Sequence, residues 1–268
     1  MKRLLLAVSF LLTYLLSDAQ LLSYTCPRDT VLGCSAPCFS IKGRFPDLRS
    51  NSGEYSIMNI SNIAGCRPYV GPGDVGPSTS LVIDDRYSAV INLPFNFPFY
   101  GASYPSLVAS TYGYLSFDVS LTGGFADWSL ASGNVPNTNY DGALVMGPWH
   151  DLDPSVTTSP NQKIKYNVIG SAPNRKWVLS FYKVPLFSAA CNNLIENTHQ
   201  IILHESSGVI EVFVFDKQQC PGWNTGRAMI GLQDITKTKA IMAPGRTATD
   251  APWGTVGMNE SWRFIPKN

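Results

Sequence analysis

Charged residues are scarce in this sequence: they make up 15% of its 268 residues, against about a quarter in an average globular protein. The 20 Lys and Arg nearly balance the 19 Asp and Glu, and no basic run follows the first few residues. A nucleic-acid-binding protein normally carries a positive stripe that neutralises phosphates, so we expect no nucleic-acid partner. No segment after the N-terminal region has the 3.6-residue periodicity of an amphipathic helix, which argues against a helical bundle.

The motifs of common hydrolases are missing as well. The sequence has only three histidines, His150, His199 and His204, and no HExxH or HxH pattern, so zinc hydrolase chemistry is not expected. No GxSxG nucleophile elbow occurs. A glycosidase needs only two carboxylates at a set separation, so a secreted glycosidase-like enzyme is kept as a third hypothesis. The interpretation we favour is that the protein is not an enzyme.

What the sequence does have is, first, the layout of a secretory signal peptide. Lys2 and Arg3 precede the apolar run 4–16, and small residues follow at the −3 and −1 positions of a cleavage site before Gln20. An uncleaved anchor is the alternative, but the run is shorter than the about 20 residues of a bilayer span. We therefore predict a signal peptide at 1–19 and a secreted, cell-surface protein without a transmembrane segment in the mature chain.

Six cysteines in an exported chain predict disulfide bonds. Cys34 and Cys38 could also form half of a zinc knuckle, but two further ligands at similarly tight spacing do not follow. Cys191 and Cys220 are the only cysteines after residue 66 and flank a predicted hairpin, so we expect them to pair. The other four cysteines allow three connectivities, and we prefer the one that joins Cys26 to Cys34 and Cys38 to Cys66.

Strand signals are regular from about residue 81. Short segments rich in β-branched and aromatic residues are bounded by Gly, Pro, Asn or Asp, and the chain holds 22 Gly and 19 Pro. The predicted strands are 87–93, 107–111, 112–118, 143–147, 164–169, 177–184, 199–205, 209–215, 228–233, 238–242 and 262–265. The strand 177–184 alternates between two faces, and 209–215 is apolar enough for a central strand.

This pattern predicts an all-β fold: a two-sheet antiparallel β-sandwich, jelly-roll-like, with a disulfide-stapled N-terminal segment. We expect a Cys-rich segment at 20–80 to pack on a main domain at 81–268. Short apolar pieces in the first part, such as 56–60, are too brief to form a core alone.

Several phrases are distinctive together: LPFNFPFYG (93–101), STYGYLSFD (110–118), DGALVMGPWHDLDP (141–154), THQIILHESSGVIEVFVFD (198–216) and CPGWNTGRAMIGLQD (220–234). Their order resembles the N-terminal β module of large secreted proteins of Bacteroidota, which carry gliding-motility-associated or type IX secretion sorting domains. They are also similar to the NIDO extracellular domain, in which a PW-x-D-x-D turn precedes a strand pair. The resemblance spans residues 26–268.

The resemblance implies an extracellular sandwich at the front of a longer protein with immunoglobulin-like repeats and a C-terminal sorting domain. The sequence stops at Asn268 without such repeats, so we expect them downstream if the chain is a fragment. The implied function is a non-catalytic module for adhesion or ligand display. Its partner would be a cell-surface or matrix protein or a glycan, and a carbohydrate-binding module is the alternative.

Asp151 and Asp153 are the candidate metal ligands. Two carboxylates two residues apart in a turn can share a calcium ion, to which Asp84, Asp85 and Asp141 could add oxygens. The alternative, which we favour, is that the two side chains cap backbone amides of the turn. No other cofactor is expected.

Ligand contacts are expected on loops that a rigid sandwich presents. The candidates lie in a long loop rich in Gly, Asn and aromatic residues: Trp128, Asn134, Asn137 and Tyr140.

Overall fold

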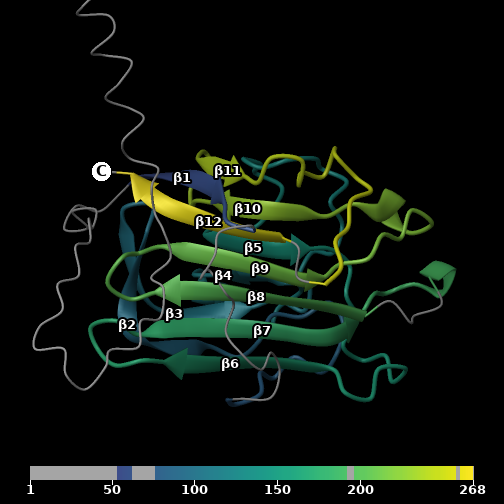
Figure 1. Cartoon of the computed structure of the whole chain (residues 1–268), viewed down its shortest axis with the longest axis horizontal. Helices are drawn as coiled ribbons and strands as arrows, with labels where there is room; N and C mark the ends of the chain where they lie inside the picture. The colour runs from purple at the N-terminus through teal and green to yellow at the C-terminus, as the bar shows by residue number, and fades with distance from the viewer. Residues whose placement is uncertain (1–52, 62–75, 192–195, 258–259, 268) are drawn as a thin grey trace, which may run out of the picture. The chain divides into compact units, whose positions relative to one another are not determined.

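The computed structural model describes residues 53–61, 76–191, 196–257 and 260–267 (Figure 1). All of them belong to one of the two compact units into which the chain divides; the other unit, Met1–Ser40 and Ile63–Arg67, lies outside the described residues. The predicted signal peptide and the pairing of Cys26, Cys34, Cys38 and Cys66 therefore also lie outside them, and both stay predictions.

The described residues form two six-stranded antiparallel sheets. The first sheet has the order β1 (Glu54–Asn59), β12 (Glu260–Lys267), β9 (Ile210–Asp216), β8 (Glu196–His204), β7 (Lys176–Pro185) and β6 (Lys163–Ile169). The second has the order β11 (Ala240–Met242), β10 (Met229–Gln233), β5 (Leu144–Trp149), β4 (Tyr114–Ser116), β3 (Ala102–Ala109) and β2 (Ile91–Phe99).

The two sheets pack as a sandwich, so the predicted fold class is confirmed. The only helical segments among the described residues are the 3₁₀ turns η2 (Val119–Leu121), η3 (Ala189–Cys191) and η4 (Asn224–Gly226). Strands β8 and β9 pair as the predicted hairpin, and β9 is an interior strand, as its apolar sequence indicated. In β7, Trp177, Leu179 and Phe181 all join the core cluster, which confirms the predicted alternation.

Strand β1 was not predicted. It is a six-residue strand with only one fully buried side chain, Tyr55, so its pattern is weak. All six of its residues pair with β12, from Glu54 opposite Lys267 to Asn59 opposite Trp262. This is tertiary pairing, which no local propensity encodes.

The first strand of the second sheet begins later than predicted. The segment predicted at 87–93 contributes only its last three residues to β2, which continues through Pro94 and Pro98 to Phe99. Both prolines are tolerated because β2 is the edge strand of its sheet, and its register to β3 shifts between Asn92 and Phe97.

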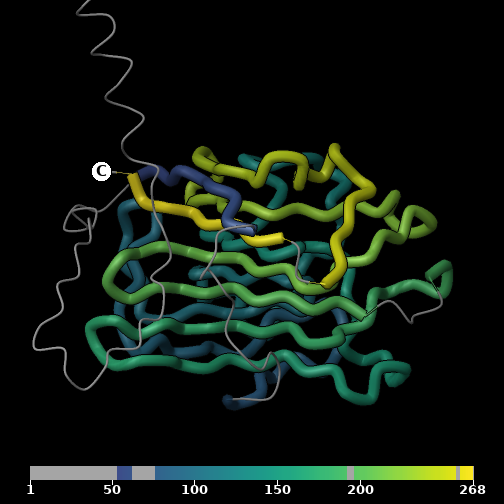
Figure 2. The backbone as a smooth tube through the Cα atoms, viewed as in Figure 1, coloured from purple at the N-terminus to yellow at the C-terminus, as the bar shows by residue number. Residues whose placement is uncertain are grey.

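Two kinds of connection leave the sandwich. Tight hairpins join β6 to β7 and β8 to β9 at the left side of Figure 2, while longer connections follow β5, β7 and β9 at the right side. The long connections contain many residues that lie outside the strands. This end is therefore where a site has room to form.

Candidate functional site

The loop end is the set of segments that gather beyond β5, β7 and β9: residues 84–85, 112–113, 127–128, 150–153, 186–191 and 217–227. Backbone hydrogen bonds join them across the sequence. His150 N donates to the carbonyl of Tyr112 (3.2 Å), and Asp153 N donates to that of Pro185 (2.8 Å). The disulfide Cys191–Cys220 ties the connection after β7 to the connection after β9, which confirms the predicted pairing.

The turn after β5 holds the two candidate metal ligands. Asp151 and Asp153 are both buried. Asp153 Oδ1 accepts hydrogen bonds from the backbone N (2.8 Å) and the hydroxyl (2.6 Å) of Ser155, which is the geometry of an Asx turn. Asp151 Oδ2 accepts from the indole Nε1 of Trp223 at 2.7 Å. Both carboxylates therefore have protein partners that organise the loop end.

Four carboxylates gather around this turn. Tyr112 donates to Asp84 (2.9 Å) and to Asp85, and the charges of Asp84, Asp85 and Asp153 all act on Asp151. Burial, followed by these like charges, raises the pKa of Asp151 to about 8 despite the hydrogen bond from Trp223. Burial also raises the pKa of Asp84 to about 6.

Calcium binding by Asp151 and Asp153 stays a prediction. Within the described part of the chain, no group of three or more His, Cys, Asp or Glu side chains is arranged to hold a metal. A melting temperature that climbs with calcium concentration, by mass action on the folded state, would support calcium. An unchanged value between chelator and millimolar calcium would leave only the turn-capping function.

Three aromatic rings, here called the aromatic trio, lie beside Asp151. Trp223 stacks on Trp128, with ring centroids 5.9 Å apart, and packs against Phe187 at 5.4 Å. Trp128 and Trp223 are partly buried, while Phe187 is 37% exposed. Of the predicted loop residues, only Trp128 belongs to this trio. The signal for Trp223 was its position three residues after Cys220, where the disulfide holds it.

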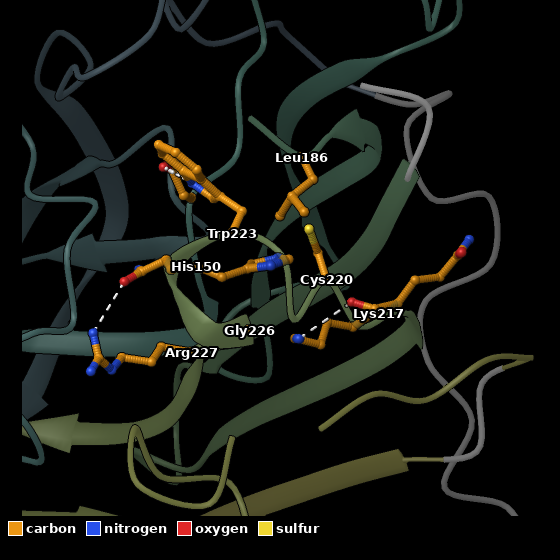
Figure 3. A pocket seen from close by; sticks show the side chains of 10 residues that line it. His150, Leu186, Lys217, Cys220, Trp223, Gly226 and Arg227 are labelled. Atoms are coloured by element: carbon orange, nitrogen blue, oxygen red, sulfur yellow. Dashed lines mark hydrogen bonds between the residues drawn. The ribbon is translucent and has the colours of Figure 1, made fainter. Parts of the chain in front are cut away.

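A shallow pocket of about 10 Å³, room for about one water molecule, adjoins the trio and is partly open to solvent. Figure 3 shows His150 between Trp223 and Cys220, with Lys217, Gly226 and Arg227 below it. His150 is 2% exposed, and its Nε2 has no hydrogen-bond partner among the described residues. Burial, and then the charge of Lys217, holds the pKa of His150 well below its usual value, so the imidazole is neutral.

The loop η4 forms one wall of this pocket. Asn224 and Thr225 have positive φ values of 44° and 51°, a conformation that β-branched threonine rarely adopts. Asn224 Oδ1 accepts from Arg227 Nη1 at 3.3 Å, and Asn224 Nδ2 is buried without a partner in the described structure. Strained backbone of this kind often marks a functional loop.

Lys217 also lines the pocket. Its Nζ donates to the carbonyl of Trp253 at 2.8 Å and lies 4.6 Å from the centre of the Trp253 ring. Burial, and then the charge of Arg246, lowers the pKa of Lys217 to about 7. The backbone hydrogen bond and the ring contact assign this side chain to holding the loops in place.

The other predicted ligand residues lie in the same long loop but make structural contacts. Tyr140 is buried against Trp149, and its hydroxyl donates to the carbonyl of Gly133 at 2.9 Å. Asn137 N donates to the Gln233 side chain at 2.7 Å. Asn134 Nδ2 donates to the hydroxyl of Thr249 at 3.0 Å. The structure does not bring these three residues to the aromatic trio.

Four glutamates have the residue type that a glycosidase would need, and all four are ion-paired. Glu205 binds Arg175, Glu260 binds Arg246 and Glu196 lies 3.3 Å from Lys183. Glu211 is buried between His204 Nε2 (2.9 Å) and Arg263 Nη2 (2.5 Å). The sequence did not predict this His–carboxylate pair. His204 and Glu211 are seven residues apart, and only the pairing of β8 with β9 brings them together.

A sequence model of the family described as NIDO related matches residues 68–261. The chain belongs to the NIDO-related family. A NIDO-related domain is an extracellular type of module and is not an enzymatic one, in agreement with the fold and with the disulfide. No curated protein and no solved structure matches the chain. In the described part of this NIDO-related chain, no helix is long and apolar enough to cross a membrane.

Proposed function

We propose that this NIDO-related chain is a non-catalytic binding module that uses its loop end for adhesion or ligand display at a cell surface. The observation that carries the proposal is the aromatic trio. Trp128, Trp223 and Phe187 come from three different connections, and Cys191–Cys220 and the Trp223–Asp151 hydrogen bond hold two of these connections in place. A preformed aromatic surface on fixed loops loses little entropy on binding.

The ionisable groups support binding over catalysis. Lys217 is engaged with Trp253, and Glu205, Glu211 and Glu260 each have an arginine partner. A general acid–base pair instead needs two groups that can reach one substrate. The neutral His150 in the pocket is the only histidine at the loop end, and it has no carboxylate partner there among the described residues.

The setting of the module is also part of the proposal. The signal-peptide layout at 1–19 and the resemblance to Bacteroidota surface proteins support export and a place at the front of a larger protein. In that setting the partner is a cell-surface or matrix protein or a glycan. Gliding motility and type IX secretion are the processes that the resemblance suggests.

Bead adhesion tests the proposal. The mature chain is immobilised on beads, and retention on cells and on extracellular matrix is compared between wild type, Phe187→Ala and Phe95→Ala. Phe95 is a matched control, because it is a partly exposed aromatic that packs under Arg175, in the β6–β7 hairpin at the other end of the sandwich. We expect about tenfold weaker retention for Phe187→Ala, roughly the 1.4 kcal/mol of one aromatic contact, and no change for Phe95→Ala.

Two outcomes would contradict the proposal. Equal retention of both variants and wild type would show that the loop end is not the binding surface. Turnover of a hydrolase substrate that disappears on substitution of one carboxylate would show that the module is an enzyme.

A further inference from the structure

The outer face of the first sheet carries buried apolar side chains. Val178 of β7, Ile202 of β8 and Phe213 of β9 are 0%, 3% and 1% exposed, yet none of them belongs to the core cluster between the sheets. Their neighbours along each strand do belong to it, and strand side chains alternate between faces, so these three point away from the second sheet. In Figure 1 no described element lies in front of β7, β8 and β9. A part of the chain outside the described residues therefore covers this face.

The buried side chains form a row across the sheet. In the strand register, Ser180 of β7 lies opposite Gln200 of β8, and Gln200 lies opposite Phe213 of β9. Phe213 in turn lies opposite Ser261 of β12. Ile60 extends the row past β12, because its backbone N donates to the carbonyl of Ser261 at 2.9 Å. All five residues are buried, so the covered strip runs from the end of β1 toward β6.

Gln200, in the middle of the row, indicates what kind of group covers it. Its Nε2 donates to the hydroxyl of Ser180 at 2.9 Å, but its Oε1 is buried without a hydrogen-bond partner among the described residues. Buried polar atoms are nearly always satisfied in folded proteins, so this oxygen needs a donor. A backbone N–H of a chain segment that crosses the sheet would provide one.

One connection of the chain begins and ends at the two ends of this row. It leaves β1 after Ser61, next to Ile60, and it returns at residues 77–79 on the opposite edge. There Thr79 N donates to the carbonyl of Ile164 at 2.9 Å, so residues 77–79 extend the sheet beyond β6. Six strand spacings of about 4.8 Å separate the two edges, about 29 Å in all. Residues 62–75 are long enough to cross this distance, since an extended chain rises about 3.3 Å per residue.

We infer that residues 68–75 pack across the outer face of the first sheet, with Tyr69 and Val70 over Phe213 and Gln200. These residues belong to the same compact unit as the sandwich, and the NIDO-related match begins at residue 68. The inference goes beyond the proposed function, because it concerns a different surface. The chain itself fills the outer face of the first sheet, which leaves the loop end as the surface for partners.

Chain length fits this placement. Val70 is six residues before Gly76, which corresponds to about 20 Å of extended chain. Phe213 lies four strand spacings, about 19 Å, from residues 77–79. Tyr69 and Val70 are also the adjacent apolar pair of a segment that otherwise consists mainly of Gly and Pro. Their side chains therefore reach the buried apolar part of the row.

Protection of an added thiol tests the inference in the full mature chain. Ser180→Cys places the thiol in the row, and Val212→Cys places one in the core cluster. Maleimide labelling of each is compared with and without Tyr69→Ser/Val70→Ser, after subtraction of the labelling of the chain that has no added cysteine. We expect Ser180→Cys to be protected and to react about tenfold faster or more once both apolar side chains are changed. The thiol of Val212→Cys should stay protected throughout.

Phe45→Ser/Leu48→Ser is the matched control, because residues 41–52 are another stretch of the same compact unit outside the described residues. Protection lost in this control and kept in Tyr69→Ser/Val70→Ser would assign the face to residues 41–52 and overturn the inference. Protection kept in both would overturn it too, as would rapid labelling of Ser180→Cys by itself. Protection that disappears on dilution would show that a second copy covers the face.

Unfolding is detected by the core probe. If Tyr69→Ser/Val70→Ser also exposes the thiol of Val212→Cys, the single change Val70→Ser is measured against Leu48→Ser by the same criteria. Faster labelling of Ser180→Cys in Val70→Ser alone, with Val212→Cys protected, would support the inference. Equal labelling of Ser180→Cys in Val70→Ser and Leu48→Ser would overturn it.

Discussion

The imidazole Nε2 of His199 lies 3.2 Å from the carbonyl oxygen of Gly113, 86 residues away in the turn that leads into β4 of the opposite sheet. The ring stacks on Phe181, with centroids 4.4 Å apart, and is fully buried. A Cβ atom at Gly113 would lie 2.6 Å from the carbonyl oxygen of Pro148 and 3.0 Å from the His199 ring, and one at Gly147 would lie 2.6 Å from the carbonyl oxygen of Gly113. The two glycines therefore make room for the one histidine that joins the two sheets just below the loop end.

We predict that Gly113→Ala lowers the free energy of unfolding far more than Gly101→Ala. Both glycines have a φ near +85°, so both substitutions cost about 1–2 kcal/mol for the left-handed backbone. Only Gly113 is also crowded, since nothing lies within 4 Å of a Cβ at Gly101. The clash should add about 1–3 kcal/mol. Urea unfolding of both variants measures the difference, and equal losses would show that the sheets move apart freely there.

We predict that His199 makes stability fall as the pH drops below neutral. Burial lowers the pKa of His199 from 6.5 to about 3, while the unfolded chain protonates near 6.5. The unfolded state thus binds more protons between these values, so the stabilisation is complete above pH 6.5 and is lost as the pH falls toward 3.

By pH 5 the loss from this one group should reach about 2 kcal/mol. The contribution of His199 is measured by comparing the urea midpoints of wild type and His199→Gln at pH 7.5 and pH 5. Every other titrating group is common to both proteins, so a larger drop in the wild-type midpoint is due to His199. Parallel pH profiles for the two proteins would mean that the pKa of His199 is the same in the folded and unfolded states.

We predict that Glu211→Gln destabilises the protein by about 3 kcal/mol at pH 7, because it removes the charge between His204 and Arg263. Although burial opposes the shift, the hydrogen bond from His204 and the charge of Arg263 lower the pKa of Glu211 from 4.5 to about 2. A lowered carboxyl pKa stabilises above pH 4.5, and that stability is lost as the pH falls toward 2. The difference in free energy of unfolding between wild type and Glu211→Gln should therefore become smaller as the pH falls from 4.5 toward 2. Chemical denaturation at pH 7, 4.5 and 3 measures this difference, and a constant difference would argue against the ion pair.

We predict that reducing Cys191–Cys220 lowers the free energy of unfolding by about 3–4 kcal/mol. The bond closes a loop of 29 residues, and an open loop gains entropy in the unfolded chain. Cys191→Ser/Cys220→Ser with and without reductant separates this bond from the other cysteines. Peptide mapping that finds Cys191 linked to an N-terminal cysteine would refute the pairing.

Much of the sandwich follows from the sequence alone. Alternation in β7, the apolar run of β9 and the Ser206–Gly208 turn are local signals, because side chains of a strand point to opposite faces with a period of two. The Cys191–Cys220 bond could also be predicted from the sequence, since the hairpin between the two cysteines brings its flanking segments to one end. Strand β1 could not be predicted, because its pairing with β12 joins residues about 200 positions apart.

The candidate site could not be predicted from the sequence alone, because it forms only through tertiary packing. The sequence marks Asp151 and Asp153 as a pair and Trp128 as a loop aromatic, and nothing local distinguishes Trp128 from the buried Tyr140. Only the packing of three connections sets Trp128, Trp223 and Phe187 together and places His150 and Asn224 at one pocket. Strand periodicity repeats along the chain, whereas the position of one loop against another depends on contacts between residues far apart in sequence, and these form only when the two sheets have packed.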